Sequence, residues 1–317
     1  MSKKRSFILL CLLSVSLFCL GTAQAAKFPE KPINYLVAFN PGGESDIFAR
    51  AQQPLLEKEF GQSVLISYKT GGGGSMGWND LIRSRPDGYN TAGFNLPHII
   101  LQPLQRKTTG YETKDIEPVM IFMNTPNILA VPANSPYKTL KDFLDAAKAK
   151  PGALTLGGSA SSSANHLGVV RLNKLAGVNI SYVPFSGTGD LMPAFLGGHV
   201  AGAMTYTTMA TQYKNDMRVL AVATERRFSL LPDVPTFREL GYDLVEGAYR
   251  GLAVPPKTPK EIINILYKAC AKVNADPEFV KKMNEMGFLL ENYDPAASAK
   301  LVDKLTVEYK ALLEDLK

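Results

Sequence analysis

Strand-like and helix-like segments alternate along almost the whole chain, and this alternation constrains the fold most strongly. A β-rich apolar run at residues 33–39 is followed by apolar side chains at helical spacing over residues 45–60, which end at Gly61. This order predicts an α/β protein in which helices flank mainly parallel sheets. Further strands are expected at residues 64–67, 90–94, 127–131, 154–156, 180–183, 200–204, 219–223 and 251–254.

The C-terminal part of the chain bears on the domain organisation. After residue 254 the sequence carries helical patterns and no strand signal. Helices alone cannot form an α/β lobe, so we expect this part to pack on a lobe that the N-terminal part forms. The sequence thus predicts a discontinuous first lobe of residues 26–127 and 226–317, with residues 128–225 as the second lobe. Two lobes leave a cleft between them, where small-molecule sites are common.

The N-terminal residues have the pattern of an export signal. Residues 3–5 are Lys-Lys-Arg, residues 7–20 are mostly apolar, and residues 23–25 are Ala-Gln-Ala. The apolar run is shorter than the roughly 20 residues that a membrane-spanning helix needs. We therefore expect residues 1–25 to be a signal peptide, cleaved after Ala25 on export to the periplasm. An uncleaved N-terminal anchor is the alternative.

Removal of this signal changes the charge and the cysteine content. Three of the 35 Lys and Arg residues lie in it, so the remaining balance against 29 Asp and Glu is 32 − 29 = +3. Such a modest charge does not favour a nucleic-acid partner. Cys11 and Cys19 also lie in the signal, which leaves Cys270 without a partner for an internal disulfide. We expect Cys270 to be a buried, inert thiol.

A glycine-rich turn after the first predicted strand is the strongest local motif. Glycines let the backbone turn sharply, and the start of the next helix carries unpaired N–H groups and a partial positive charge that favour an anion. The alternative is a plain turn between a strand and a helix. The candidate ligand-binding residues here are Phe39, Asn40, Gly42, Gly43, Glu44, Ser45 and Asp46.

A serine-rich loop repeats this arrangement in the second predicted lobe. Serine hydroxyls can donate hydrogen bonds to a carboxylate, although such a loop can also be a solvated linker. If the two loops face each other across the cleft, they form a clamp for a small organic acid. A third corner at residues 185–189 adds Ser186. The candidates in the serine-rich loop are Ser159, Ser161, Ser162, Ser163, Asn165 and His166.

The sequence offers little support for catalysis, a cofactor or a metal. A G-x-S-x-G pattern places Ser75 between a strand and a helix, and a secreted serine hydrolase would pair it with Asp190 and His199. Glycine runs generate this pattern freely, so the hydrolase is the alternative interpretation. His98, His166 and His199 lack metal-ligand spacing, and we interpret His98 and His199 as satisfied or exposed. The absence of a catalytic set favours a binding protein.

Five segments in a fixed order carry a family resemblance. They are residues 28–33, 40–46 with 49–50, 85–89, 230–236 and 255–259. Together they resemble the solute receptors of the tripartite tricarboxylate transporters, the TctC or Bug family, over nearly the whole chain after the signal. The resemblance implies a two-lobed type II periplasmic-binding fold that closes on a carboxylate. It also implies a monomer without a cofactor that delivers its ligand to a membrane permease and catalyses no reaction.

The resemblance also implies where the ligand residues lie. The family's first ligand loop falls on residues 39–46, the second falls on residues 157–166, and a strand-end corner falls on Thr205 and Tyr206.

Two charged residues depart from the family pattern. The family usually has a small residue in place of Glu44, and many relatives have an apolar or amide residue in place of Arg250. An arginine can hold a carboxylate through two hydrogen bonds. If both face the cleft, we expect Arg250 to hold a ligand carboxylate while Glu44 selects a hydroxyl, an amine or a bound cation. A surface position for Arg250 and a receptor for a non-acidic solute are the alternatives.

Overall fold

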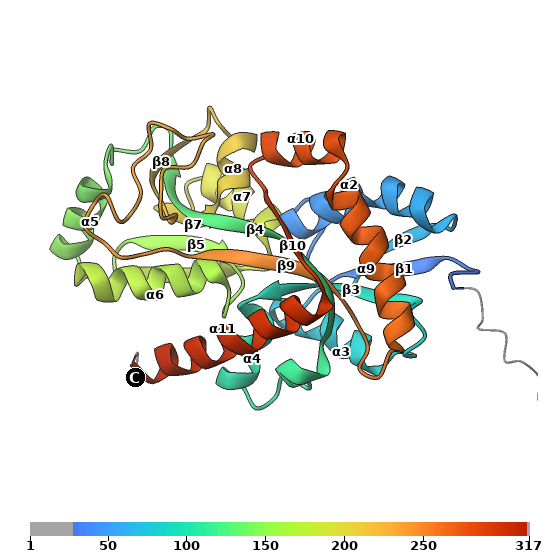
Figure 1. Cartoon of the computed structure of the whole chain (residues 1–317). Helices are drawn as coiled ribbons and strands as arrows, with labels where there is room; N and C mark the ends of the chain where they lie inside the picture. The colour runs from blue at the N-terminus through green and yellow to red at the C-terminus, as the bar shows by residue number, and fades with distance from the viewer. Residues whose placement is uncertain (1–27, 316–317) are drawn as a thin grey trace, which may run out of the picture.

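One long strand connects the two lobes of the molecule. The computed structural model describes residues 28–315 (Figure 1). Strand β4 (Glu117–Pro132) pairs through its first half with β9 (Gly247–Val254) and β10 (Leu289–Tyr293). Its second half pairs with β7 (Gly202–Tyr206) and β8 (Met217–Val222). The predicted signal peptide, residues 1–25, lies outside the described residues.

Each lobe is built on a mixed sheet. The first has the order β2-β1-β3-β9-β4 with β10 also on β4, and the second has β8-β4-β7-β5-β6. Pairs among β1, β2 and β3 and among β5, β6 and β7 are parallel, whereas every pair that involves β4 or β9 is antiparallel. The predicted two-lobed α/β fold is confirmed, although the sequence does not predict antiparallel pairing at the crossing strands. The remaining strands are β1 (Ile33–Val37), β2 (Val64–Tyr68), β3 (Asn90–Leu96), β5 (Thr155–Ser159) and β6 (Ser181–Phe185).

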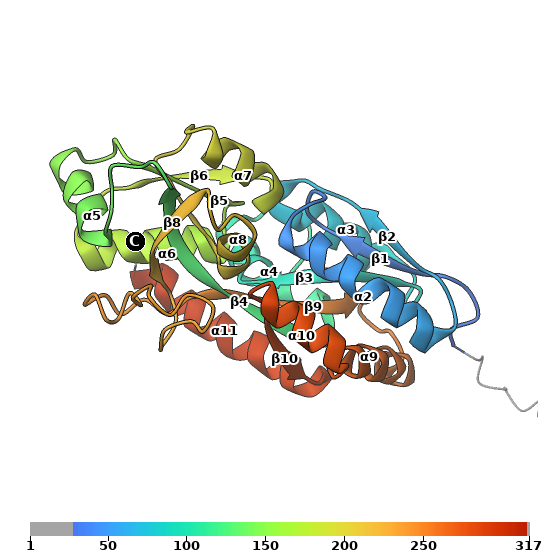
Figure 2. The ribbon, with the colours of Figure 1, turned by 90° about the horizontal axis from the view of Figure 1, so that it is seen from above.

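Helices cover both sheets. Seen from above, α2 and α3 lie beside β1 to β3 on one side, while α5, α6 and α7 surround β5 and β6 on the other (Figure 2). The helices are α2 (Glu44–Phe60), α3 (Ser75–Arg83), α4 (His98–Gln105), α5 (Leu140–Ala149), α6 (Ala164–Ala176), α7 (Thr188–Leu196), α8 (Thr207–Gln212), α9 (Lys260–Asn274), α10 (Pro277–Glu285) and α11 (Pro295–Asp315). In the described part of the chain, none of these helices is long and apolar enough to cross a membrane.

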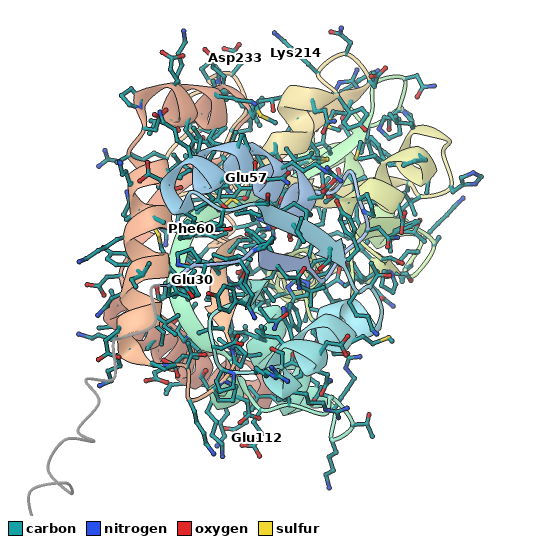
Figure 3. The ribbon with its side chains drawn as sticks, turned by 90° about the vertical axis from the view of Figure 1, so that its right-hand side faces the viewer. Glu30, Glu57, Phe60, Glu112, Lys214 and Asp233 are labelled. Atoms are coloured by element: carbon teal, nitrogen blue, oxygen red, sulfur yellow. The ribbon has the colours of Figure 1, made fainter. Side chains whose placement is uncertain are left out.

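Helix α2 begins at the pocket described below, and its sequence explains where the helix packs and where it ends. It buries Phe48 in the first lobe's core and ends at Gly61, whose φ of 61° is a left-handed conformation that glycine adopts without steric cost. Figure 3 labels Glu57 and Phe60 near this end. A carboxylate oxygen of Glu57 accepts from the N–H of Val64 at 3.0 Å, which ties the end of α2 to the start of β2.

The C-terminal helices pack on the first lobe. Leu266 and Val273 of α9 share a core with Ile33 and Val37 of β1. Strand β10 runs antiparallel to β4 within this C-terminal part, where the sequence carries no strand signal. None of its five residues is fully buried, which explains why the apolar alternation that predicts a strand is missing.

The chain leaves the second lobe later than the sequence predicts. Phe237 and Leu244 are fully buried in a core with Phe143 of α5. The return to the first lobe lies beside Asn127, whose N–H donates to Glu246 O at 2.9 Å. We therefore propose the second lobe boundary near Glu246, in place of the expected one at residue 226.

Candidate functional site

A polar pocket lies between the two lobes. It forms where parallel strands of both sheets end and the following helices begin, which is the usual position of ligands in such sheets. The lining residues are Phe39, Gly43, Glu44, Ser45, Asn95, His98, Ser159, Gly187, Thr188, Tyr206 and Arg250. Seven of these eleven are residues that the sequence singles out: Phe39, Gly43, Glu44, Ser45, Ser159, Tyr206 and Arg250.

Two helix starts converge on this pocket from opposite lobes. Gly43 is the N-cap of α2 and Gly187 is the N-cap of α7. The N–H of Glu44 donates to Thr188 Oγ1 at 3.2 Å, and a Cβ on Gly43 would lie 3.2 Å from the same oxygen. Glycine at this position therefore allows the close approach of the two helices. The first turns of both helices therefore bring two features to the pocket. One is a set of backbone N–H groups that have no acceptor within the helix, and the other is a partial positive charge.

The two residues that depart from the family pattern form an ion pair with each other in the pocket wall. Glu44 contacts Nη2 of Arg250, and only 1% and 5% of the two side chains are exposed. The other carboxylate oxygen of Glu44 accepts from Thr208, and Nη1 of Arg250 donates to Thr125 Oγ1 at 2.7 Å. The guanidinium lies 4.7 Å from the centre of the Tyr206 ring. Arg250 is thus buried, not on the surface.

Burial and pairing act against each other on Glu44. Burial raises the pKa of the Glu44 carboxyl, whereas Arg250 and the hydrogen bond from Thr208 lower it. The pair therefore depends on both partners: removal of either leaves a charge in a nearly dry environment.

A chain of hydrogen bonds supports the second lobe's side of the pocket. Ser159 Oγ donates to Asn165 Oδ1 at 2.6 Å, and Asn165 Nδ2 donates to Asn127 Oδ1 at 3.0 Å. The hydroxyl of Tyr206 lies 3.3 Å from Ser159 Oγ. Burial raises the pKa of Tyr206 to about 12, so this hydroxyl is neutral at physiological pH.

His98 lines the pocket, and the sequence interpretation missed it. It is 1% exposed, and neither ring nitrogen has a hydrogen-bond partner among residues 28–315. Burial, together with Arg250 and Arg106, lowers the pKa of His98 to about 3. The ring is therefore neutral, with one N–H donor and one nitrogen acceptor. The available signal was its place at the first residue of α4, directly after β3, where the chain again passes from strand to helix.

Two predicted residues of the first loop make their hydrogen bonds outside the pocket. Asp46 accepts from Gly42 N at 2.7 Å, from Arg50 at 2.8 Å and from Tyr68 at 2.6 Å. Asn40 Nδ2 donates to Asp190 Oδ2 at 2.6 Å and so connects the lobes.

Most of the serine-rich loop supports its own conformation. Ser163 caps α6 by accepting from the N–H of His166 at 3.0 Å. Ser162 Oγ donates to Gln105 Oε1 at 2.5 Å, which is a second contact between the lobes. Thr205 is fully buried, and no hydrogen bond reaches its Oγ1 within the described chain.

The other predicted residues line hollows of their own. Ser161 and Ser186 lie beside the glycine run at Gly72–Gly74, and His166 of α6 lines a hollow between α4, α6 and α11.

The alternative catalytic constellation is not assembled. Asp190 accepts from Asn40, and His199 lies beside Gly197 at the end of α7. Within residues 28–315, no hydrogen bond joins either of them to Ser75, and no cluster of three or more potential metal ligands occurs.

Comparison with known proteins identifies the family. Residues 48–317 match the model described as "Tripartite tricarboxylate transporter family receptor". The chain belongs to this receptor family. A relative from Cupriavidus necator, named "UPF0065 protein in gbd 5'region", is 31% identical over 297 residues, which cover 93% of this chain and 90% of that protein. The resemblance to the TctC and Bug receptors is therefore confirmed.

Solved structures of similar proteins agree with the fold. The periplasmic binding protein BugD is 28% identical with a TM-score of 0.86, and the match covers 91% of this receptor and 98% of BugD. MatC from Rhodopseudomonas palustris, solved with bound malate, is 25% identical with a TM-score of 0.83, and the match covers 90% of this receptor and 99% of MatC. The protein is a solute-binding receptor of a periplasmic family.

Proposed function

We propose that this receptor binds a small organic carboxylate in the pocket between its lobes and delivers it to the permease of a tripartite tricarboxylate transporter. The observation that carries this proposal is the convergence of α2 and α7 on one buried pocket. Helix starts attract anions, and a carboxylate can accept from several of their N–H groups at once.

The polar groups that surround the pocket support a small anionic ligand. The hydroxyls of Thr188 and Tyr206 add neutral donors to the helix starts. The malate bound to MatC supports a carboxylate as the ligand class, since that protein shares the family fold.

A thermal-shift screen of di- and tricarboxylates, aromatic acids and amino acids tests the proposal. An acid at 100 times its dissociation constant should stabilise the fold by about 2.7 kcal/mol. Uncharged isosteres of the same acid, such as its alcohol, should give no shift. Stabilisation by neutral solutes and by none of the acids would contradict a carboxylate receptor.

We further propose that the lobes close on the ligand by a hinge at the crossing strands near Asn127 and Glu246. The contacts of Asn40 with Asp190 and of Ser162 with Gln105 join the lobes on both sides of the pocket and would form on closure. X-ray scattering should show a smaller radius of gyration with a saturating acid than without it. An unchanged radius would argue against hinge closure.

The remaining parts of the proposal concern location and delivery. We propose export to the periplasm, cleavage after Ala25 and a monomeric receptor. The intact mass of protein released from the periplasm should correspond to a chain that begins at Ala26, and a mass that includes residues 1–25 would contradict cleavage. Uptake of the bound acid by vesicles that contain the permease should require the added receptor.

A further inference from the structure

The pocket wall contains one positive and one negative side chain, and they neutralise each other. Arg250 is the one arginine or lysine among the lining residues, Glu44 is the one acid, and His98 is neutral. Nη2 of Arg250 already contacts Glu44 and Nη1 donates to Thr125 Oγ1, so both terminal nitrogens of the guanidinium have partners and its charge is compensated before a ligand carboxylate arrives. A carboxylate in this pocket therefore depends on the helix starts and the neutral donors.

The same lining residues keep hydrogen-bonding capacity that no described residue uses. Nε of Arg250 is buried without an acceptor, whereas Oε2 of Glu44 contacts Nη2 of the same guanidinium. Both ring nitrogens of His98 are also buried and unpartnered among residues 28–315. The pocket residues thus hold two unused donors, Nε–H of Arg250 and one ring nitrogen of His98, and one unused acceptor, the other ring nitrogen of His98. Buried groups of this kind are costly unless a partner fills them.

This pattern distinguishes between possible ligand groups. A hydroxyl or a primary amide donates and accepts, so it can satisfy the acceptor nitrogen of His98 and Nε–H of Arg250 together. A carboxylate only accepts, and next to Glu44 it would place two negative charges together in a site of low polarity.

We propose, as an extension of the carboxylate-receptor function above, that the Glu44–Arg250 pair selects acids with a single carboxylate and a hydroxyl or amide group, and discriminates against dicarboxylates. The carboxylate of the ligand lies at the starts of α2 and α7, and its hydroxyl or amide group meets the pair. Glu44 acts as the selecting residue, and Arg250 compensates its charge.

Isosteric probes test this selection. Succinate, glutarate and adipate each have a monoamide of nearly the same shape, in which one carboxylate is replaced by a group that also donates. Isothermal titration calorimetry of the full receptor with each pair gives a ratio of dissociation constants. For the best-fitting chain length, the monoamide should bind at least about 10-fold more tightly than the dicarboxylate, as expected for a buried hydrogen bond to a charged group.

The Glu44→Gln variant should reverse this preference. It keeps the size of the side chain but leaves Arg250 uncompensated, so the dicarboxylate should gain about 10-fold or more in affinity. Glu246→Gln is the matched control, because Glu246 is also a buried acid paired with an arginine but does not line the pocket. It should leave the ratio of the two dissociation constants unchanged.

Circular dichroism establishes whether each variant folds. If Glu44→Gln does not fold, the double variant Glu44→Gln/Arg250→Gln replaces the ion pair with two neutral side chains, and the dicarboxylate and its monoamide should then bind within about threefold of each other. A wild-type receptor that binds the dicarboxylate more tightly, or a ratio that neither variant changes, would overturn the selection but not the carboxylate-receptor function. Failure of every acid in the series and in the wider screen would overturn both.

Discussion

Two buried pairs of a glutamate and an arginine lie in different regions of this receptor, and they serve different purposes. Glu44 and Arg250 line the interlobe pocket with 1% and 5% of their side chains exposed. Glu246 and Arg171 lie where the chain returns from the second lobe, and 26% of the Arg171 side chain is exposed. Arg171 also donates to the backbone oxygens of Asp243 and Val245, so it fixes the return segment to α6.

The difference shows that burial of an ion pair does not by itself indicate a binding site. Each pair has a glutamate whose pKa burial raises, and for Glu246 the value is about 7. Of the two pairs, only the Glu44–Arg250 pair lies at the convergence of two helix starts and lines a pocket together with the unpartnered ring of His98. We therefore assign ligand selection to Glu44 and Arg250, and to Glu246 and Arg171 the structural role of holding the return segment on α6.

The largest expected effect is that of Arg250→Ala on stability. It leaves Glu44 buried without its counter-charge, which should lower the free energy of unfolding by about 3–5 kcal/mol. Urea denaturation followed by circular dichroism measures it. Arg171→Ala is the control, and its loss should be smaller because water reaches that pair. Equal losses for the two variants would remove the distinction between the pairs.

A smaller effect is expected for Thr208→Val. This change removes the hydroxyl that donates to Glu44 and keeps the shape of the side chain, so we expect a loss of about 1.5–3 kcal/mol. Thr211→Val on the same helix removes a hydroxyl that donates to the neutral oxygen of Met286 at 2.8 Å and should cost about 0.5–1.5 kcal/mol. A loss for Thr208→Val no larger than that for Thr211→Val would indicate that Glu44 does not depend on this bond.

A further expected effect is pH-dependent and concerns the second pair. Burial raises the pKa of Glu246 from 4.5 to about 7, so the folded state keeps this proton over a range in which the unfolded state releases it. The resulting stabilisation is complete below pH 4.5 and is lost as the pH rises towards 7. The free energy of unfolding of wild type minus that of Glu246→Gln should therefore fall over this range, and a difference that rises would contradict the raised pKa.

Much of the architecture could be predicted from local patterns. Gly43 and Gly61 lie directly before and after α2 and mark its two ends, so the bounds of this helix could be predicted from local sequence alone. The antiparallel pairs around β4 and the place of β10 depend on partners far along the chain. The strands in these pairs are short or partly exposed, so their sequences show no apolar periodicity that would predict the pairing.

The site was predictable at the level of loops but not of side chains. Glu44 and Asp46 lie two residues apart in the same helical turn, yet Glu44 faces Arg250 and Asp46 faces Arg50. Most serines of the second loop bond within the protein, and only Ser159 lines the pocket. The packing of the two lobes determines the hydrogen-bond partner of each polar side chain. No local sequence pattern predicts these partners. His98 was missed for the same reason.

The structure of the receptor bound to the tightest acid from the screen tests the central claim most directly. We predict that the ligand carboxylate lies at the first turns of α2 and α7, with the Glu44–Arg250 pair intact and a hydroxyl or amide of the ligand in contact with it. A ligand carboxylate paired with Arg250 and a displaced Glu44, or a ligand outside this pocket, would contradict the account.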